Sequence, residues 1–195
     1  MKKKIYHFIL KTLGFKIDTV NLPPELKKCV LLFAPHTSYC DFVIGAMAIY
    51  VMGFKAKLLI KKEAFFWPLA PLLRKAGGFP VDRKKVKRFP IYAANFIKEQ
   101  DECAFLISPE GHRKLVTEWK KGFYFIAIEA GVPIVPGYLD FRSKRGGVLP
   151  AFYPTGDYDE DLKELEKNYY GMHGYHKGQF NLEDKPYAFP EWLEK

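Results

Sequence analysis

A histidine and an aspartate, His36 and Asp41, lie five positions apart where an apolar run gives way to polar residues. Residues 29–34 (CVLLFA) are typical of a buried strand, and Thr37 or Ser38 could cap a following helix that carries Asp41 in its first turn. An aspartate there can accept the imidazole N–H and stabilise the imidazolium as the other ring nitrogen takes a proton. The pair predicts a general base whose attacking hydroxyl comes from the substrate.

A competing nucleophile lies inside the same spacing. Cys40 is four residues after His36, and a Cys–His pair could form an acyl-enzyme. A small buried thiol is the simpler interpretation of Cys40, since free cysteines are among the most buried residues.

A glycine-rich turn further along precedes an arginine. Gly77 and Gly78 permit a tight turn, and Arg83 follows a short expected strand at 79–82. A guanidinium at a strand end can hold a phosphate with two hydrogen bonds. Taken alone, this arginine would be interpreted as half of a surface ion pair with Asp82.

A third cluster, Glu110, Gly111, His112 and Arg113, follows an expected strand at 104–108. The preceding proline makes the turn abrupt, so that it presents one carboxylate and several backbone amides. We expect Glu110 to accept hydrogen bonds from a polyol and Arg113 to help bind its phosphate.

Strands and helices alternate along the chain, which predicts an α/β fold: a single domain with a mostly parallel central sheet flanked by helices. Ligands of such sheets bind outside the carboxyl ends of the strands, and His36, Arg83 and Glu110 each follow an expected strand. The expected strands are 29–34, 57–60, 79–82, 104–108 and 132–139, and the expected helices begin after His36 or cover 63–75, 86–99 and 119–130.

The N-terminal stretch has a basic amphipathic pattern. Ile5, Phe8, Ile9 and Leu13 recur at spacings of three and four among five lysines, as in a helix that lies in a membrane interface. A surface helix packed on its own domain has the same pattern, and both interpretations stay open. We therefore divide the chain into an amphipathic membrane-association segment, 1–22, and one folded domain, 23–195.

The charge balance points to anionic partners. A net charge of +9 draws the chain toward nucleic acid, anionic lipid headgroups, phosphorylated substrates or an acidic carrier protein. The positive charges are scattered, and no helix carries a dense basic face, which argues against a nucleic-acid-binding domain. The aromatic segment 63–73, beside several lysines, could be core, line an acyl tunnel or enter the membrane interface; we favour the last.

The expected location is the cytoplasmic face of the cell membrane, as a peripheral protein. Three widely spaced cysteines form neither a disulfide framework nor a CxxC metal pair, which favours a reducing compartment. No export signal is expected, and the longest uncharged apolar run, 42–54, is shorter than the roughly 20 residues of a bilayer crossing. His173 and His176, with Asp157, Asp159 and Asp161 upstream, lack recognisable ligand spacing, so we expect solvated loop across this stretch and no metal.

Taken in order, these blocks resemble the glycerophospholipid acyltransferase family, whose familiar member is 1-acyl-glycerol-3-phosphate acyltransferase. The resemblance covers 35–136, about half the chain. The matches are His36 and Asp41 to His-x4-Asp, Gly77, Asp82 and Arg83 to Gly-x4-Asp-Arg, 109–113 to Pro-Glu-Gly-x-Arg, and 132–136 to Val-Pro-Ile-Val-Pro.

The resemblance implies that an acyl group moves from acyl-CoA or acyl carrier protein to the free hydroxyl of a lysophospholipid, without a metal or organic cofactor. The acceptor it suggests is 1-acyl-glycerol-3-phosphate, which would become phosphatidic acid in phospholipid biosynthesis. His36 would be the base and Asp41 its support. The implied substrate-binding residues are Lys61, Arg83, Glu110, Gly111 and Arg113.

The chain departs from the family pattern at four positions. Pro35 stands where asparagine is common, which bears on how His36 is oriented. Pro80 replaces a usual aromatic residue. His112 and Lys114 stand where threonine and serine are typical, which bears on the headgroup. An acyltransferase for another lysolipid, such as a lyso-aminolipid, therefore stays an alternative.

Overall fold

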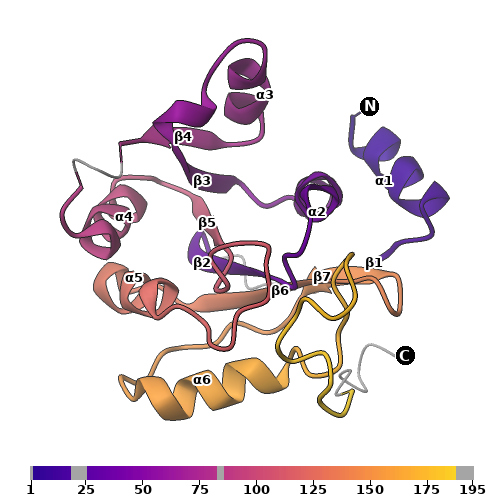
Figure 1. The fold of residues 1–195 in the computed structure, drawn as a ribbon. Helices are drawn as coiled ribbons and strands as arrows, with labels where there is room; N and C mark the ends of the chain where they lie inside the picture. Colours follow the sequence, from indigo (N-terminus) through magenta and orange to yellow (C-terminus); the bar gives the residue numbers. More distant parts are fainter. Residues whose placement is uncertain (1, 19–25, 83–85, 188–195) are drawn as a thin grey trace.

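Seven strands of the described residues form one sheet in the order β1-β7-β6-β2-β5-β3-β4 (Figure 1). The computed structural model describes residues 2–18, 26–82 and 86–187. Neighbouring strands run parallel except β6 and β7, so the mostly parallel sheet predicted from the sequence is confirmed. The strands are β1 (Lys16–Asp18), β2 (Lys28–Ala34), β3 (Ala56–Lys61), β4 (Gly78–Val81), β5 (Cys103–Ile107), β6 (Ile134–Asp140) and β7 (Arg145–Val148).

Helices cover both faces of this sheet (Figure 1). Helices α4, α5 and α6 pack with one face in the largest apolar cluster, and α1 and α2 pack on the other face. The helices are α1 (Lys2–Thr12), α2 (Tyr39–Met52), α3 (Leu69–Lys75), α4 (Phe89–Lys98), α5 (Gly122–Ala130) and α6 (Tyr158–Lys167), with a 3-10 turn, η1, at Lys62–Ala64.

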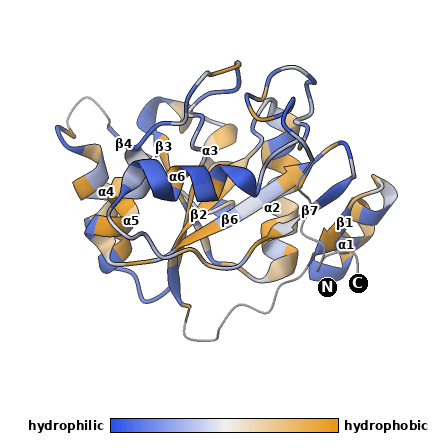
Figure 2. Cartoon of the chain, turned by 90° about the horizontal axis from the view of Figure 1, so that it is seen from below, coloured by the Kyte–Doolittle hydropathy of each residue, from blue (hydrophilic) through white to orange (hydrophobic). Residues whose placement is uncertain are grey.

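The central strand β2 is apolar because both of its faces are covered. Val30 and Leu32 point into the cluster that contains α4 and α5, whereas Leu31 and Phe33 point toward α2. This alternation follows the two-residue period of a strand, and continuous apolar sequence is typical of buried parallel strands. Figure 2 shows the same contrast, with apolar strands inside and a largely hydrophilic α6 outside.

The helix expected at 63–75 is interrupted, so that prediction was wrong in its extent. The η1 turn ends at Ala64, and α3 begins only at Leu69, after Pro68. Proline has no backbone N–H and disfavours helical geometry in the residue before it, which breaks the helix at this place.

The loop expected near the C-terminus is also partly wrong, because α6 occupies Tyr158–Lys167. Asp157 caps the helix by accepting the backbone N–H groups of Asp159 and Glu160. Apolar residues at helical spacing, Tyr158, Leu162 and Leu165, pack in the main cluster. That spacing is typical of a helix, but the many charged residues around it obscure the pattern in the sequence.

The expected N-terminal helix is present as α1 and packs on its own domain, whereas a membrane contact stays a prediction. Its Leu10 is buried, and Tyr6 contacts Tyr50 of α2 edge-on at 5.1 Å, so one side packs on the domain. Ile5 and Phe8 remain exposed on another side. None of the helices in the described residues is long and apolar enough to span a bilayer.

Candidate active site

His36 and Glu110 lie side by side because their strands are neighbours. β2 and β5 pair in parallel, so the loops after their carboxyl ends meet at the same edge of the sheet. The backbone N–H of His36 donates to Glu110 Oε1 at 3.0 Å and to Oε2 at 3.3 Å. The fold thus joins the first and third sequence motifs.

The turn between His36 and α2 wraps around the carboxylate of Asp41. Ser38 is the N-cap of α2, and its hydroxyl donates to Asp41 Oδ1 at 3.0 Å while accepting the Asp41 N–H at 3.2 Å. The backbone N–H groups of Thr37 and Ser38 donate to Oδ2 at 2.5 and 2.7 Å. Asp41 is fully buried, so these donors stabilise its charge and fix its position.

The imidazole of His36 lies beside this carboxylate, just beyond hydrogen-bonding distance. Nδ1 is 3.8 Å from Asp41 Oδ2, and this buried nitrogen has no hydrogen-bond partner among the described residues. Burial lowers the pKa of His36; the charge of Asp41 opposes this effect and that of Arg113 adds to it. The ring is therefore neutral near pH 7 and able to take a proton.

Glu110 lies behind His36 and is 1% exposed. Burial raises the pKa of its carboxyl group to about 8, although the His36 N–H opposes the shift, and the charge of Asp41 adds to it. The side chain is not among those that line the cavity described below. The structure therefore gives no support to the predicted polyol contact and indicates a positioning role at the His36 backbone.

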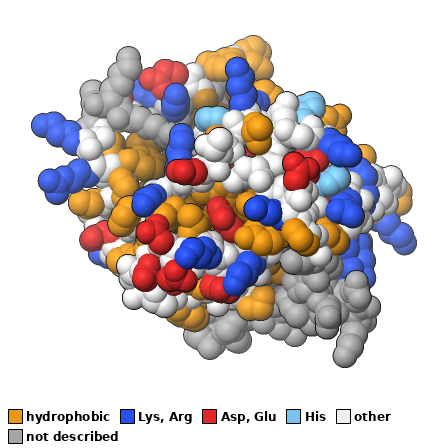
Figure 3. Space-filling view, turned by 60° about the horizontal axis from the view of Figure 1, so that its bottom comes forward, with side chains coloured by type: hydrophobic (Ala, Val, Ile, Leu, Met, Phe, Trp, Pro, Cys, Tyr) orange, Lys and Arg blue, Asp and Glu red, His pale blue; other side chains and the backbone are white. Residues whose placement is uncertain are grey.

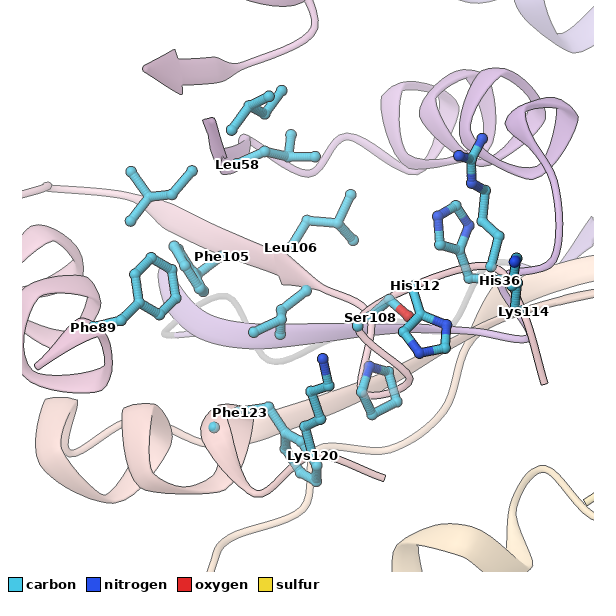
Figure 4. A pocket seen from close by; sticks show the side chains of 17 residues that line it. His36, Leu58, Phe89, Phe105, Leu106, Ser108, His112, Lys114, Lys120 and Phe123 are labelled. Atoms are coloured by element: carbon cyan, nitrogen blue, oxygen red, sulfur yellow. The ribbon is translucent and has the colours of Figure 1, made fainter. Parts of the chain in front are cut away.

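A cavity of about 720 Å³ opens at this edge of the sheet, with His36 in its wall (Figure 4). Its two ends differ in polarity. Leu58, Phe89 and Phe123 are among the apolar side chains of one end, whereas His112 and Lys114 lie at the other end, beside His36.

Three basic side chains, Arg113, Lys114 and Lys120, line the cavity. The guanidinium of Arg113 stacks on the ring of Tyr39, with Cζ 3.6 Å from the ring centroid, which fixes its plane. Lys120 was not predicted from the sequence. Its backbone N–H donates to the Pro109 carbonyl at 2.8 Å, and its side chain lies directly over Gly111, where a Cβ would approach Nζ to 2.8 Å.

The other predicted binding residues differ in where they lie relative to the cavity. Gly111 lines the cavity and has a positive φ of 74°, which suits glycine in this turn. Lys61, at the end of β3, is exposed and is not among the lining residues. Arg83 lies outside the described residues. The roles implied for these three residues stay predictions.

Cys40 is exposed in the first turn of α2, so the expectation of a buried thiol was wrong. The inward position of that turn belongs to the neighbouring Asp41. In the parts of the chain that the structure describes, no group of three His, Cys, Asp or Glu side chains converges as a metal site requires.

Comparisons with known proteins agree with this geometry. The family model described as Acyltransferase matches residues 16–140, which include all four motifs. Among solved structures, the chain is similar to the 1-acyl-sn-glycerophosphate (LPA) acyltransferase PlsC from Thermotoga maritima, with a TM-score of 0.55 and 18% identity over 85% of this chain and 74% of that one. At that identity the likeness concerns the fold. No curated protein sequence matches the chain significantly. The family match covers well over half of the sequence, and the chain belongs to the Acyltransferase family.

Proposed function

We propose that this protein transfers a fatty acyl group from acyl-CoA or acyl carrier protein to the free hydroxyl of 1-acyl-glycerol-3-phosphate, forming phosphatidic acid in phospholipid biosynthesis. The observation that carries the proposal is a cavity with an apolar end and a polar end, where the neutral imidazole of His36 lies beside basic side chains. A lysophosphatidic acid has matching parts: an acyl chain, and a hydroxyl next to a phosphate. Family membership and the fold of the Thermotoga maritima enzyme support the same reaction class.

His36 would act as the general base. Its Nδ1 is buried beside Asp41, which leaves Nε2 as the nitrogen for the substrate hydroxyl. As Nε2 takes the hydroxyl proton, the oxygen attacks the thioester carbonyl, and the tetrahedral intermediate then breaks its C–S bond. The thiolate leaves with the proton from the imidazolium. Asp41 stabilises that imidazolium, and its 3.8 Å contact shortens to a hydrogen bond as the charge forms.

Arg113, Lys114 and Lys120 would bind the phosphate of the acceptor. Arg113 suits two parallel hydrogen bonds because its plane is already fixed against Tyr39. Lys61 and Arg83 remain candidates for further phosphate contacts. On the face drawn in Figure 3, Lys and Arg side chains of the described residues lie among acidic and apolar ones.

The protein would work as a peripheral protein at an anionic membrane surface, on its cytoplasmic face. Trp67 is 85% exposed, Phe66 59% and Leu72 63%, and none of the three lines the active-site cavity. Basic residues flank them: Lys61, Lys62, Arg74 and Lys75. Aromatic side chains next to cations suit the headgroup region of an anionic bilayer. The exposed side of α1 is similar, and three free cysteines suit a reducing compartment.

Mass spectrometry of lipid products tests the reaction. Purified protein is incubated with 1-acyl-glycerol-3-phosphate and either acyl-CoA or acyl carrier protein, with a panel of other lysolipids in parallel. His36→Ala should lower the rate by at least about 10²-fold, since general-base catalysis contributes that much, whereas Cys40→Ala should keep wild-type activity.

Each other outcome removes a defined part of the proposal. Loss of activity in Cys40→Ala would indicate an acyl-enzyme instead of direct attack. Product from another lysolipid alone would refute the acceptor. A folded wild-type protein that acylates nothing would refute the function.

Vesicle binding tests the membrane surface separately. Trp67→Ala should weaken sedimentation with vesicles that contain anionic phosphatidylglycerol, and salt should weaken binding of the wild type. Tyr153→Ala is the matched control, because Tyr153 is an aromatic residue, 66% exposed, outside this segment. Equal binding of all three proteins would contradict the proposed surface.

A further inference from the structure

The last described part of the chain covers the turn that carries His36. Residues 171–187, here called the strap, follow α6 and return toward the carboxyl end of β6, in yellow in Figure 1. The strap lies outside the residues matched by the family model, 16–140. The proposed mechanism assigns it no role.

Hydrogen bonds fix the strap in place. The carboxylate of Asp140, the last residue of β6, accepts the backbone N–H of His173 and the hydroxyl of Tyr187, both at 2.9 Å. The backbone N–H of Gly171 donates to the Leu182 carbonyl at 2.9 Å, which closes the strap on itself. The segment between these bonds therefore has a defined position over the sheet edge.

Thr37 connects the strap to the catalytic turn. Its Oγ1 accepts the backbone N–H of His176 at 3.0 Å, and the same hydroxyl donates to Asp41 Oδ2 at 3.5 Å. Thr37 is 3% exposed, and Gly174 packs directly against its side chain. A Cβ at Gly174 would come within 2.6 Å of Thr37 Oγ1, so only glycine fits there without a shift.

We propose that the strap positions the His36–Asp41 pair through Thr37, and that Thr37 and Gly174 are positioning residues for acyl transfer. The backbone N–H of Thr37 also holds Asp41 Oδ2, so any displacement of Thr37 moves two of the groups that fix this carboxylate. The gap between Oδ2 and His36 Nδ1 is 3.8 Å, a distance at which a small shift decides whether the two bond.

The strap acts on this turn with a backbone N–H and a close packing contact. The charged groups that affect His36 are Asp41 from α2 and Arg113 from the turn after β5, while Glu110 holds its backbone. Because the strap bonds to Thr37 through the His176 backbone, replacing the His176 side chain should leave the reaction unchanged.

Steady-state kinetics of Thr37 variants give the first test, which rests on the proposed function. Thr37→Val keeps the volume and removes the acceptor of the His176 N–H, so kcat should fall about 10- to 100-fold at an unchanged KM. Thr37→Ser keeps the oxygen and should restore most of kcat. A wild-type kcat in Thr37→Val would overturn the proposal.

A double-mutant cycle shows whether the strap acts through Thr37. Gly174→Ala should lower kcat in the wild-type background and have a smaller effect in the Thr37→Ala background, where the two nearest atoms, Cγ2 and Oγ1, are gone and only Cβ, at 3.0 Å, remains. Gly146→Ala in β7 is the matched control, because its Cβ would approach Leu139 Cδ1 to 2.9 Å, outside the cavity wall. It should lower Tm and leave kcat unchanged. Equal effects of Gly174→Ala in both backgrounds would refute the connection.

An NMR titration of the His36 imidazole tests how this side chain is positioned and does not depend on acyl transfer. Burial is the main reason for the low pKa of His36. In Thr37→Val the turn should loosen and admit water, and an Asp41 oxygen should lose its contact with Thr37. Both changes should raise the pKa of His36. Thr37→Ser should keep the wild-type value. An unchanged pKa in Thr37→Val would overturn the proposal, whereas absent activity in the wild type would concern the proposed function alone.

Discussion

Replacing Glu110 by glutamine tests whether its carboxyl group supports His36 or contacts substrate. Glutamine has nearly the same shape and keeps an oxygen that can accept the His36 N–H, but it does not titrate. In the folded chain burial raises the pKa of Glu110 from its ordinary 4.5 to about 8. Between these two pKa values the folded state binds a proton at Glu110 that the unfolded state does not bind. The stability that this proton contributes is complete below pH 4.5 and is lost as the pH rises through 8.

The magnitude follows from the separation of the two pKa values. Each pH unit between them changes the free energy of unfolding by about 1.4 kcal/mol. From pH 6 to pH 9 the free energy of unfolding of the wild type should therefore fall by roughly 3 kcal/mol relative to that of Glu110→Gln. That is a large part of the roughly 5–15 kcal/mol that stabilises a typical domain.

Denaturant unfolding of both proteins at pH 6, 7, 8 and 9 measures this difference, because all other titrating groups are common to both. We expect the stability of Glu110→Gln to rise relative to that of the wild type as the pH rises. Its kcat and its KM for the acceptor should stay close to the wild-type values. A stability difference that is constant across pH would refute the raised pKa. A tenfold rise in the KM for the acceptor would show that Glu110 contacts substrate, as the sequence motif first suggested.

Other substitutions test the cavity and the core. Tyr39→Ala removes the ring under Arg113, a contact worth about 0.5–1 kcal/mol, so the KM for a phosphorylated acceptor should rise about 2- to 5-fold at unchanged kcat; Tyr39→Phe should match wild type in the same kinetics. Leu58→Trp fills the apolar end of the cavity and should shift competition between acyl thioesters toward shorter chains. Gly45→Ala places a Cβ 2.6 Å from the Phe33 ring and should cost about 1–3 kcal/mol in denaturant unfolding, and an unchanged stability would show that Phe33 moves freely.

The central part of the fold was predictable because its signals are local. The run CVLLFA marks β2 by continuous apolar character, and Ser38 followed by Asp41 marks the start of α2 by the chemistry of its cap. Two short strands, β1 and β7, were missed. β1 has three residues and β7 has the sequence RGGV, so neither carries a hydrophobic pattern; their register depends on pairing across the sheet.

The missed parts of the site depend on contacts between distant segments. Lys120 faces the cavity because its backbone bonds to Pro109, and the strap reaches Thr37 across more than a hundred residues of sequence. Glu110 was correctly grouped with His36, but the direction of its side chain follows from how the loops after β2 and β5 meet. Spacing in a sequence identifies which motifs gather at a sheet edge and does not show which side chains face inward.

The position of Asp41 explains how a neutral histidine and a buried carboxylate can coexist before catalysis. The aspartate lies in the first turn of α2, where backbone N–H groups and the helix dipole stabilise negative charge. Donors from Thr37 and Ser38 already satisfy its oxygens, so it needs no proton or cation from His36 at rest. In the proposed mechanism, the imidazole is therefore free to stay neutral and accept the proton of the substrate hydroxyl. When it does, the negative charge that stabilises it is already in place 3.8 Å away, and only a small movement is required.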